Sequence, residues 1–246
     1  MDDAEQTATA ISDADRPQQR ADLVARGGAR AAVLGANDGL ISNLSLILGV
    51  AGANASQGSV RLAGFASLVA GALSMAAGEW VSVRAQVDLY SGVLGELRTL
   101  VAHNPALVLD RLSSKLEDIG MDTDTAKRAA TEIPLDEESF FAFTARTVFG
   151  IDSDELGNPV TAALSSLMLF AAGALVPLMP WFFTRGLAGA IWSLALTATA
   201  ALFVGAYVSR SAGMPQWKGA LRQFLIVLAA AGVTYGIGKL TGTAIR

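Results

Sequence analysis

The sequence predicts an all-α membrane protein with five transmembrane helices and a small cytosolic helical domain inserted between the second and third helices. Hydrophobic residues make up 52% of the 246 residues and charged residues only 16%, which is more apolar and less charged than a typical soluble domain. Five apolar stretches are each long enough to cross a bilayer. A polar stretch, residues 84–158, separates the second of them from the third.

The apolar stretches follow one another with short connections, apart from the polar insert. The first covers residues 30–53 and the second covers residues 61–83. Because only a short polar turn separates them, we expect two antiparallel neighbours. The last stretch carries Gly232 and Gly236, a small-xxx-small pair suited to tight helix contact. The three spans after the insert are expected at residues 160–183, 187–208 and 217–240.

The polar stretch contains the start and stop signals of several helices. Its first helix is expected to continue without a break from the second span. Proline is favoured at the first helical position, Asp caps helix N-termini, and Gly often ends a helix. The boundaries are accordingly expected at Asn104-Pro105, Gly120, Asp122, Ile133-Pro134, Asp136 and Gly150.

We therefore divide the chain into a disordered cytosolic tail (1–28), two spans (29–83), an acidic helical domain that could bind metal (84–158) and three further spans (159–246). The tail is polar and lacks the apolar core of a cleavable signal peptide. Lysines and arginines gather before the first span, in the helical domain and near Arg210. The positive-inside rule then places the N-terminus in the cytosol and the C-terminus outside. The Ala- and Arg-rich composition favours a prokaryotic plasma membrane, or the vacuolar membrane if the source is a eukaryote.

Composition excludes several classes of function. The net charge of −4 gives no basic excess, which argues against nucleic acid as a partner. Cysteine is absent, so disulfides and thiolate metal sites are excluded. The single histidine, His103, is expected at the surface, and a di-iron carboxylate site needs two Glu-x-x-His pairs. The sequence has no phosphate-binding glycine loop and no credible Ser/His/Asp set. We expect neither an enzyme nor a tightly bound cofactor.

Two acids lie inside the first two spans, and each shares a helical face with small residues. Asp38 falls on a stripe with Gly35, Ser42, Ser45, Gly49 and Gly52, and Glu79 falls on a similar stripe with Met75. A carboxylate at membrane depth costs roughly 2.5–3.5 kcal/mol on insertion scales, so it usually faces a protein interior or a water-filled path.

The types of these side chains indicate a path for divalent metal ions. Carboxylates bind hard cations such as Mn²⁺, and the thioether of Met75 adds a softer ligand. Together with Asp38 and Glu79 it would suit Fe²⁺ and disfavour Ca²⁺ and Mg²⁺. The alternative is that the two acids only touch lipid headgroups or pair with Arg30 or Arg84.

The helical domain supplies a second group of acids. Residues 84–158 hold 14 acidic side chains against 7 basic ones. Four glutamates could converge to collect divalent ions: Glu96, Glu117, Glu137 and Glu138. The alternative is that these glutamates form an ordinary solvated helical face.

Three motifs resemble the vacuolar iron transporter family: GANDGLIS in the first span, AGALSMAAGEWVSV in the second and FAAGALVPLMPW in the third. The resemblance implies a homodimeric exporter of Fe²⁺, and often Mn²⁺, in exchange for protons. It also implies an ion path between the first spans of two subunits, with Asp38, Met75 and Glu79 at the family's functional positions. Family members commonly carry a Glu-x-x-Glu pair after the second span, whereas this chain has Glu96 followed by Thr99.

The leading hypothesis is a proton-coupled exporter of divalent metals, with metal ions, protons, the bilayer and a second copy of the chain as its partners. One alternative is a membrane-bound metal-binding oxidase, which only the acidic insert favours. The other alternative is a non-transporting membrane scaffold whose polar stripes serve helix packing alone.

Overall fold

The computed structural model describes residues 28–132, 136–152 and 156–244, and all regular elements within these ranges are helices. The predicted tail up to residue 27 and the helix break at Ile133-Pro134 lie outside the described residues. The expected all-α fold with five spans is confirmed, because five described helices are long and apolar enough to cross a membrane. They are α2 (Gly28–Gly52), α3 (Gln57–His103), α7 (Pro159–Leu178), α8 (Gly186–Ser211) and α9 (Gln216–Ala244).

The chain divides into two compact units. The membrane unit comprises residues up to Trp80 and from Val160 onward, and the helical unit comprises Val81–Pro159. Helix α3 is unbroken for 47 residues, as the sequence predicts. At about 1.5 Å per residue it measures about 70 Å, more than twice the thickness of a bilayer core.

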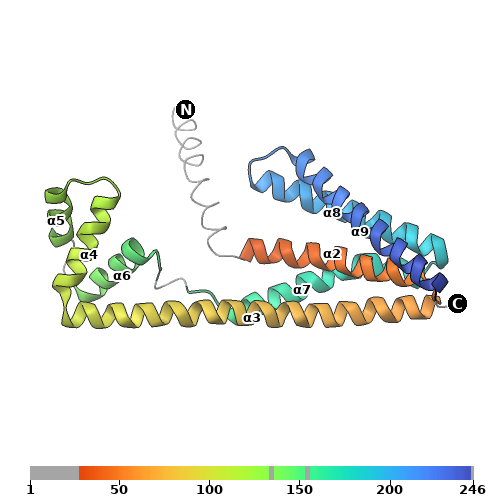
Figure 1. Cartoon of the computed structure of the whole chain (residues 1–246), viewed down its shortest axis with the longest axis horizontal. Helices are drawn as coiled ribbons and strands as arrows, with labels where there is room; N and C mark the ends of the chain where they lie inside the picture. The colour runs from red at the N-terminus through yellow and green to blue at the C-terminus, as the bar shows by residue number, and fades with distance from the viewer. Residues whose placement is uncertain (1–27, 133–135, 153–155, 245–246) are drawn as a thin grey trace, which may run out of the picture. The chain divides into compact units, whose positions relative to one another are not determined.

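The helical unit consists of the second part of α3 together with α4 (Pro105–Asp118), α5 (Thr123–Glu132) and α6 (Glu137–Phe149) (Figure 1). Helix α4 starts where the sequence predicts, because the side chain of Asn104 accepts a hydrogen bond from the backbone N–H of Leu107. Helix α6 ends at Gly150, whose φ of 66° is left-handed and whose N–H bonds back to the helix.

Two small apolar clusters hold the helical unit together. The first joins the second part of α3 to α4 and α6 through Leu97, Val108 and Phe141. The second joins α4 to α5, where Leu112 packs against Ala126. Each helix of the unit therefore buries one apolar face and leaves its polar face exposed.

Aspartate caps make the helical unit sensitive to acid. Hydrogen bonds from the side chain and the backbone N–H of Ser139 lower the pKa of Asp136, and those of Thr125 lower the pKa of Asp122. An aspartate with a lowered pKa stabilises the fold above its unfolded-state value of about 3.9, and this contribution disappears as the pH falls through the lower folded value.

We therefore expect the helical signal of the protein to decrease below about pH 4, and the Asp122→Asn/Asp136→Asn variant to lose less of it. Asparagine caps a helix about as well as aspartate but does not titrate. Circular dichroism of the two proteins between neutral and acidic pH measures the difference. Identical acid profiles would show that these caps do not contribute to the pH dependence.

In the membrane unit, α2 and α7 run parallel in very close contact. A Cβ atom added to Gly39 would lie 2.9 Å from the backbone nitrogen of Ala174 and closer still to the carbonyl oxygen of Phe170. One turn further on, the Asn43 side-chain amide donates a hydrogen bond of 2.6 Å to the carbonyl oxygen of Ala174. Because the contacts advance by four residues on both helices together, the two helices share one direction.

Helix α9 packs against the C-terminal part of α2 in the same parallel sense. A Cβ atom on Gly238 would lie 2.8 Å from the carbonyl carbon of Gly49, and one on Gly242 would lie 2.6 Å from Cα of Ala53. Backbone therefore meets backbone here too, which small residues allow.

The glycine pair expected to make this contact does not make it. A Cβ atom on Gly232 or Gly236 would meet nothing within 4 Å. Gly238 and Gly242 form the small-xxx-small pair that meets α2. The four-residue spacing of the contacting glycines is as predicted, but these glycines lie on another face of α9 than Gly232 and Gly236.

The remaining contacts close the bundle. Helices α8 and α9 form an antiparallel hairpin (Figure 1), and a Cβ atom on Gly205 of α8 would lie 2.7 Å from the carbonyl carbon of Gly219. Helix α7 ends in a short 3₁₀ turn, η1 (Met179–Phe182), whose Trp181 is buried. The side chain of Gln57, at the start of α3, donates hydrogen bonds of 2.8 and 2.9 Å to the carbonyl oxygens of Trp181 and Thr184.

Candidate metal site

Asp38 lies within the membrane-spanning part of α2, which covers Val33–Gly52. Its carboxylate is half-buried and accepts a hydrogen bond of 2.6 Å from the hydroxyl of Ser42, one turn later. Since a helix rises about 1.5 Å per residue, Asp38 lies about 21 Å before the end of α2 and about 7 Å inside the span. Asp38 thus lies within the apolar stretch of α2 and not at its end.

The small-residue stripe of α2 divides between two faces. Gly35 and Gly52 are buried against neighbouring helices. Ser42 is exposed on the surface of the single chain, on the side of α2 where Leu34 and Leu46 are also exposed. The half-buried carboxylate of Asp38 thus borders an apolar surface that the described residues do not cover.

Met75 and Glu79 lie one turn apart on α3. Met75 is half-buried and packs against the cluster formed by Ala72, Phe170 and Ala174. Glu79 is half-buried, and within the described residues no hydrogen bond or ion pair engages its carboxylate. Asp38 lies about 21 Å along α2 from the connection between α2 and α3. Met75 and Glu79 lie about 27 and 33 Å along α3 from the same connection. The three side chains therefore lie at successive levels along α2 and α3.

These two acids stand alone in the membrane unit. Residues 28–80 and 160–244 contain no other Asp or Glu, although they contain seven Lys and Arg residues. The alternative partner Arg84 forms an ion pair of 3.0 Å with Asp88, and the side chain of Arg30 lies outside the described part of the chain. The structure thus supplies no cationic partner for Asp38 from the residues that it describes.

In the described part of the chain, the four glutamates of the helical unit do not form a metal-binding cluster. Glu138 forms a salt bridge of 2.7 Å with Arg98, whose guanidinium also lies over the ring of Phe141. Glu96 and Glu137 are exposed and Glu117 is half-buried. Across the described residues, no three His, Asp or Glu side chains come close enough to hold a metal ion together. His103 is exposed, as expected.

A comparison with known protein families decides the classification: the sequence profile of the VIT family matches residues 29–239. The chain belongs to the VIT family. The match covers the membrane unit, including the segments that carry Asp38, Met75 and Glu79, together with the helical unit.

Individual VIT-family relatives match over most of their length. A vacuolar iron transporter of Acanthamoeba castellanii is 33% identical over 93% of this chain and 84% of its own length. Vacuolar iron transporter homolog 1 of rice, Oryza sativa subsp. japonica, is 33% identical over 87% of this chain and 73% of its own. Vacuolar iron transporter homolog 2 of Arabidopsis thaliana is 31% identical over 87% and 84%.

The structure adds three buried polar residues to the VIT-family segments around Asp38. Asn43 is fully buried and ties α2 to α7, and Ser166 of α7 is also fully buried. The side-chain oxygens of Asn37, Asn43 and Ser166 receive no hydrogen bond from the described residues. Each of the three could have been singled out from the sequence, because each is a polar residue within an apolar span.

The hydrogen bond from Ser42 orients the carboxylate of Asp38. Removing this hydrogen bond tests the site while the carboxylate stays in place. If Asp38 binds a transported metal ion, the Ser42→Ala variant is expected to show an apparent affinity for Fe²⁺ that is about tenfold lower, because partners that orient metal ligands typically contribute 10–100-fold. The concentration dependence of Fe²⁺ uptake into proteoliposomes measures it. Ser45→Ala, a neighbouring serine outside this hydrogen bond, is the matched control. Equal affinity in both variants would contradict an orienting role.

Proposed function

We propose that this chain exports Fe²⁺, and also Mn²⁺, from the cytosol in exchange for protons, acting as a homodimer. The observation that carries the proposal is Asp38, a half-buried carboxylate inside a span, held by one hydroxyl and without a cationic partner among the described residues. Such a costly charge is retained where it faces a protein interior or an ion path. The names of the relatives, vacuolar iron transporters, support iron as the cargo.

The proposed path passes the three side chains in the order of their positions along α2 and α3. The acidic helical unit attracts cations on the cytosolic side of the membrane. A metal ion then passes Glu79, meets the thioether of Met75 and reaches Asp38, and these ligands replace part of its water shell. Protons entering from the other side neutralise the carboxylates, which weakens their hold and releases the ion.

A second copy of the chain accounts for two features of the site. One chain brings no three acidic or histidine side chains together within its described residues, whereas a metal ion usually requires at least four ligands. The serine that holds Asp38 lies on an exposed surface with Leu34 and Leu46. If two such surfaces meet, the acids are shielded from lipid and each chain contributes ligands to one path.

Uptake of Fe²⁺ into proteoliposomes that contain the purified full-length protein tests the proposal. The vesicle interior is made acidic, and a fluorescent chelator inside reports the metal. We expect Fe²⁺ and Mn²⁺ to enter faster when the interior is acidic than without a proton gradient, and the interior to lose protons as metal enters. Ca²⁺ serves as the control cation and is expected to stay outside.

Three outcomes would contradict the proposal. Metal uptake without any release of protons from the vesicles would exclude proton coupling. Absence of uptake for every divalent metal would favour the scaffold hypothesis, and Fe²⁺-dependent consumption of O₂ without uptake would favour the oxidase. Crosslinking of the protein in the same vesicles tests the homodimer separately, since a monomer that transports would contradict only that part.

A further inference from the structure

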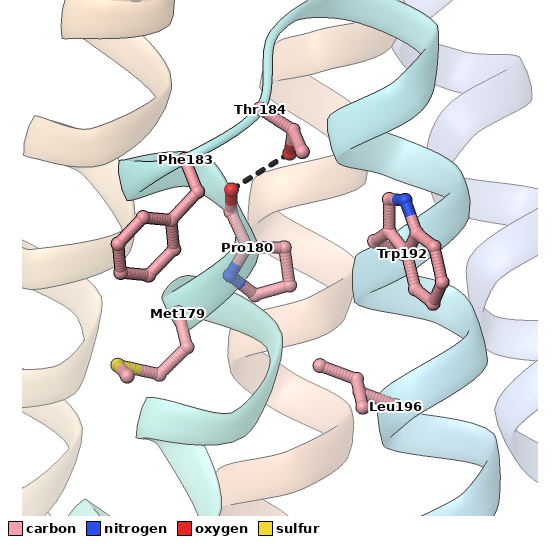
Figure 2. A pocket seen from close by; sticks show the side chains of 6 residues that line it. All are labelled: Met179, Pro180, Phe183, Thr184, Trp192 and Leu196. Atoms are coloured by element: carbon pink, nitrogen blue, oxygen red, sulfur yellow. Dashed lines mark hydrogen bonds between the residues drawn. The ribbon is translucent and has the colours of Figure 1, made fainter.

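A groove of about 330 Å³ lies on the surface of the membrane unit where α7 ends and α8 begins. Figure 2 shows Pro180 between Met179 and Phe183 on one side and Trp192 and Leu196 of α8 on the other. The one hydroxyl in the lining belongs to Thr184, and it donates a hydrogen bond of 2.7 Å to the carbonyl oxygen of Pro180. With the hydroxyl of Thr184 engaged in this way, the groove presents a mainly hydrocarbon surface, and the indole N–H of Trp192 is the remaining polar group on the side chains that line it.

Two arginines lie at the same end of the membrane unit as the groove. Arg185 directly follows Thr184 and is exposed, and the guanidinium of Arg61 lies 5.9 Å from the ring centre of Phe182, the neighbour of Phe183. The hydrogen bond from Gln57 to the carbonyl oxygen of Thr184 fixes the start of α3 beside this turn. Arg61, one turn after Gln57, therefore lies beside Phe182, in the same turn as the lining residues Phe183 and Thr184.

Neither arginine has an acidic partner among the described residues. The composition of the membrane unit explains why, because Asp38 and Glu79 are its only acids in residues 28–80 and 160–244. Both lie far along their helices from this end, at about 21 and 33 Å from the connection between α2 and α3. Arg61 and Arg185 thus present two positive charges that no acid of the described membrane residues neutralises.

We propose that this groove binds a phospholipid with an anionic headgroup. One acyl chain occupies the surface between Met179, Pro180, Trp192 and Leu196, and the headgroup phosphate pairs with Arg185 and Arg61. The charge complementarity selects an anionic lipid over a neutral one, since basic residues at the membrane surface attract anionic headgroups. Aromatic side chains at the end of α7 suit the same interfacial position. The proposal does not depend on which ion the protein transports.

Native mass spectrometry of the full-length protein tests the proposal with phosphatidylglycerol and phosphatidylcholine added at equal concentration. We expect the parent protein to retain phosphatidylglycerol preferentially, and the Arg61→Gln/Arg185→Gln variant to retain about tenfold less of it. The matched control is Arg210→Gln/Lys218→Gln, which removes the same charge elsewhere in the membrane unit. Equal losses in both double variants would show unspecific charge attraction and overturn the proposal.

A second measurement tests the groove itself. Phosphatidylglycerol with brominated acyl chains is expected to quench the fluorescence of Trp192, seen as a difference between the parent protein and the Trp192→Phe variant. Leu196→Phe narrows the groove at an exposed position and leaves both arginines in place, so we expect it to reduce lipid retention and quenching together. Quenching that is equal for brominated phosphatidylcholine, or unchanged by Leu196→Phe, would overturn the proposal.

Discussion

Replacing Asp38 with Asn is expected to reduce proton-driven Fe²⁺ uptake by about 100-fold or more. The substitution keeps the size of the side chain and its capacity to accept a hydrogen bond from Ser42, but it removes the negative charge that, in the proposed function, holds the ion and accepts the proton. Loss of a group that merely orients a metal ligand typically costs 10–100-fold, and we expect loss of the ligand's charge to cost more. Uptake into proteoliposomes measures the effect.

The folded state of this variant provides the control. An intramembrane carboxylate costs roughly 2.5–3.5 kcal/mol on insertion scales, so Asp38→Asn should leave thermal stability in detergent unchanged or increase it. A loss of uptake with retained stability therefore reports on function. The charge-preserving Asp38→Glu variant should keep part of the activity. Undiminished uptake by Asp38→Asn would mean that this carboxylate does not bind the ion.

Adding one methyl group at Gly39 is expected to destabilise the membrane unit by about 1–3 kcal/mol, the range typical of overpacked cores. The new Cβ atom of Gly39→Ala would lie 3.0 Å or less from three backbone atoms of α7. Backbone atoms cannot rotate away as a flexible side chain can, so α2 and α7 must separate. That movement also strains the 2.6 Å hydrogen bond between Asn43 and Ala174. A lower midpoint of thermal unfolding in detergent is the expected result.

The chain contains a matched control for this substitution. Gly232 lies inside α9, where an added Cβ atom meets nothing within 4 Å. The Gly232→Ala variant gains helix propensity, up to about 1 kcal/mol, without a clash. The same chemical change should therefore act in opposite directions at the two positions. Equal midpoints for both variants would show that the close contact between α2 and α7 does not limit stability.

Local signals predicted the helices of this protein well. Asn104 and Asp136 cap α4 and α6, and Gly150 ends α6, because each of these effects depends only on residues within one turn. The five spans followed from the length of the apolar stretches. The start of α3 shows the limit of this reasoning: the helix begins at Gln57, inside the expected polar turn, since Ser56 accepts a hydrogen bond from the backbone N–H of Ser59.

Contacts between helices were harder to predict from the sequence. Gly232-xxx-Gly236 and Gly238-xxx-Gly242 have the same spacing, and only the rotation of α9 about its axis decides which pair meets α2. Glu138 pairs with Arg98, 40 positions earlier, a contact that helical periodicity does not encode. Asp38 could be chosen as a candidate from the sequence alone, because the cost of an acid in an apolar span depends on the residue and its solvent and not on distant contacts.

The contact of α2 with both α7 and α9 through bare backbone has a mechanical consequence. Where glycine carbonyls touch the adjoining helix directly, no side chain remains that could change rotamer and let one helix slide past the other. Helices α2, α7 and α9 must then move as a single rigid block. A conformational change in the membrane unit would then displace this block as a whole against α3.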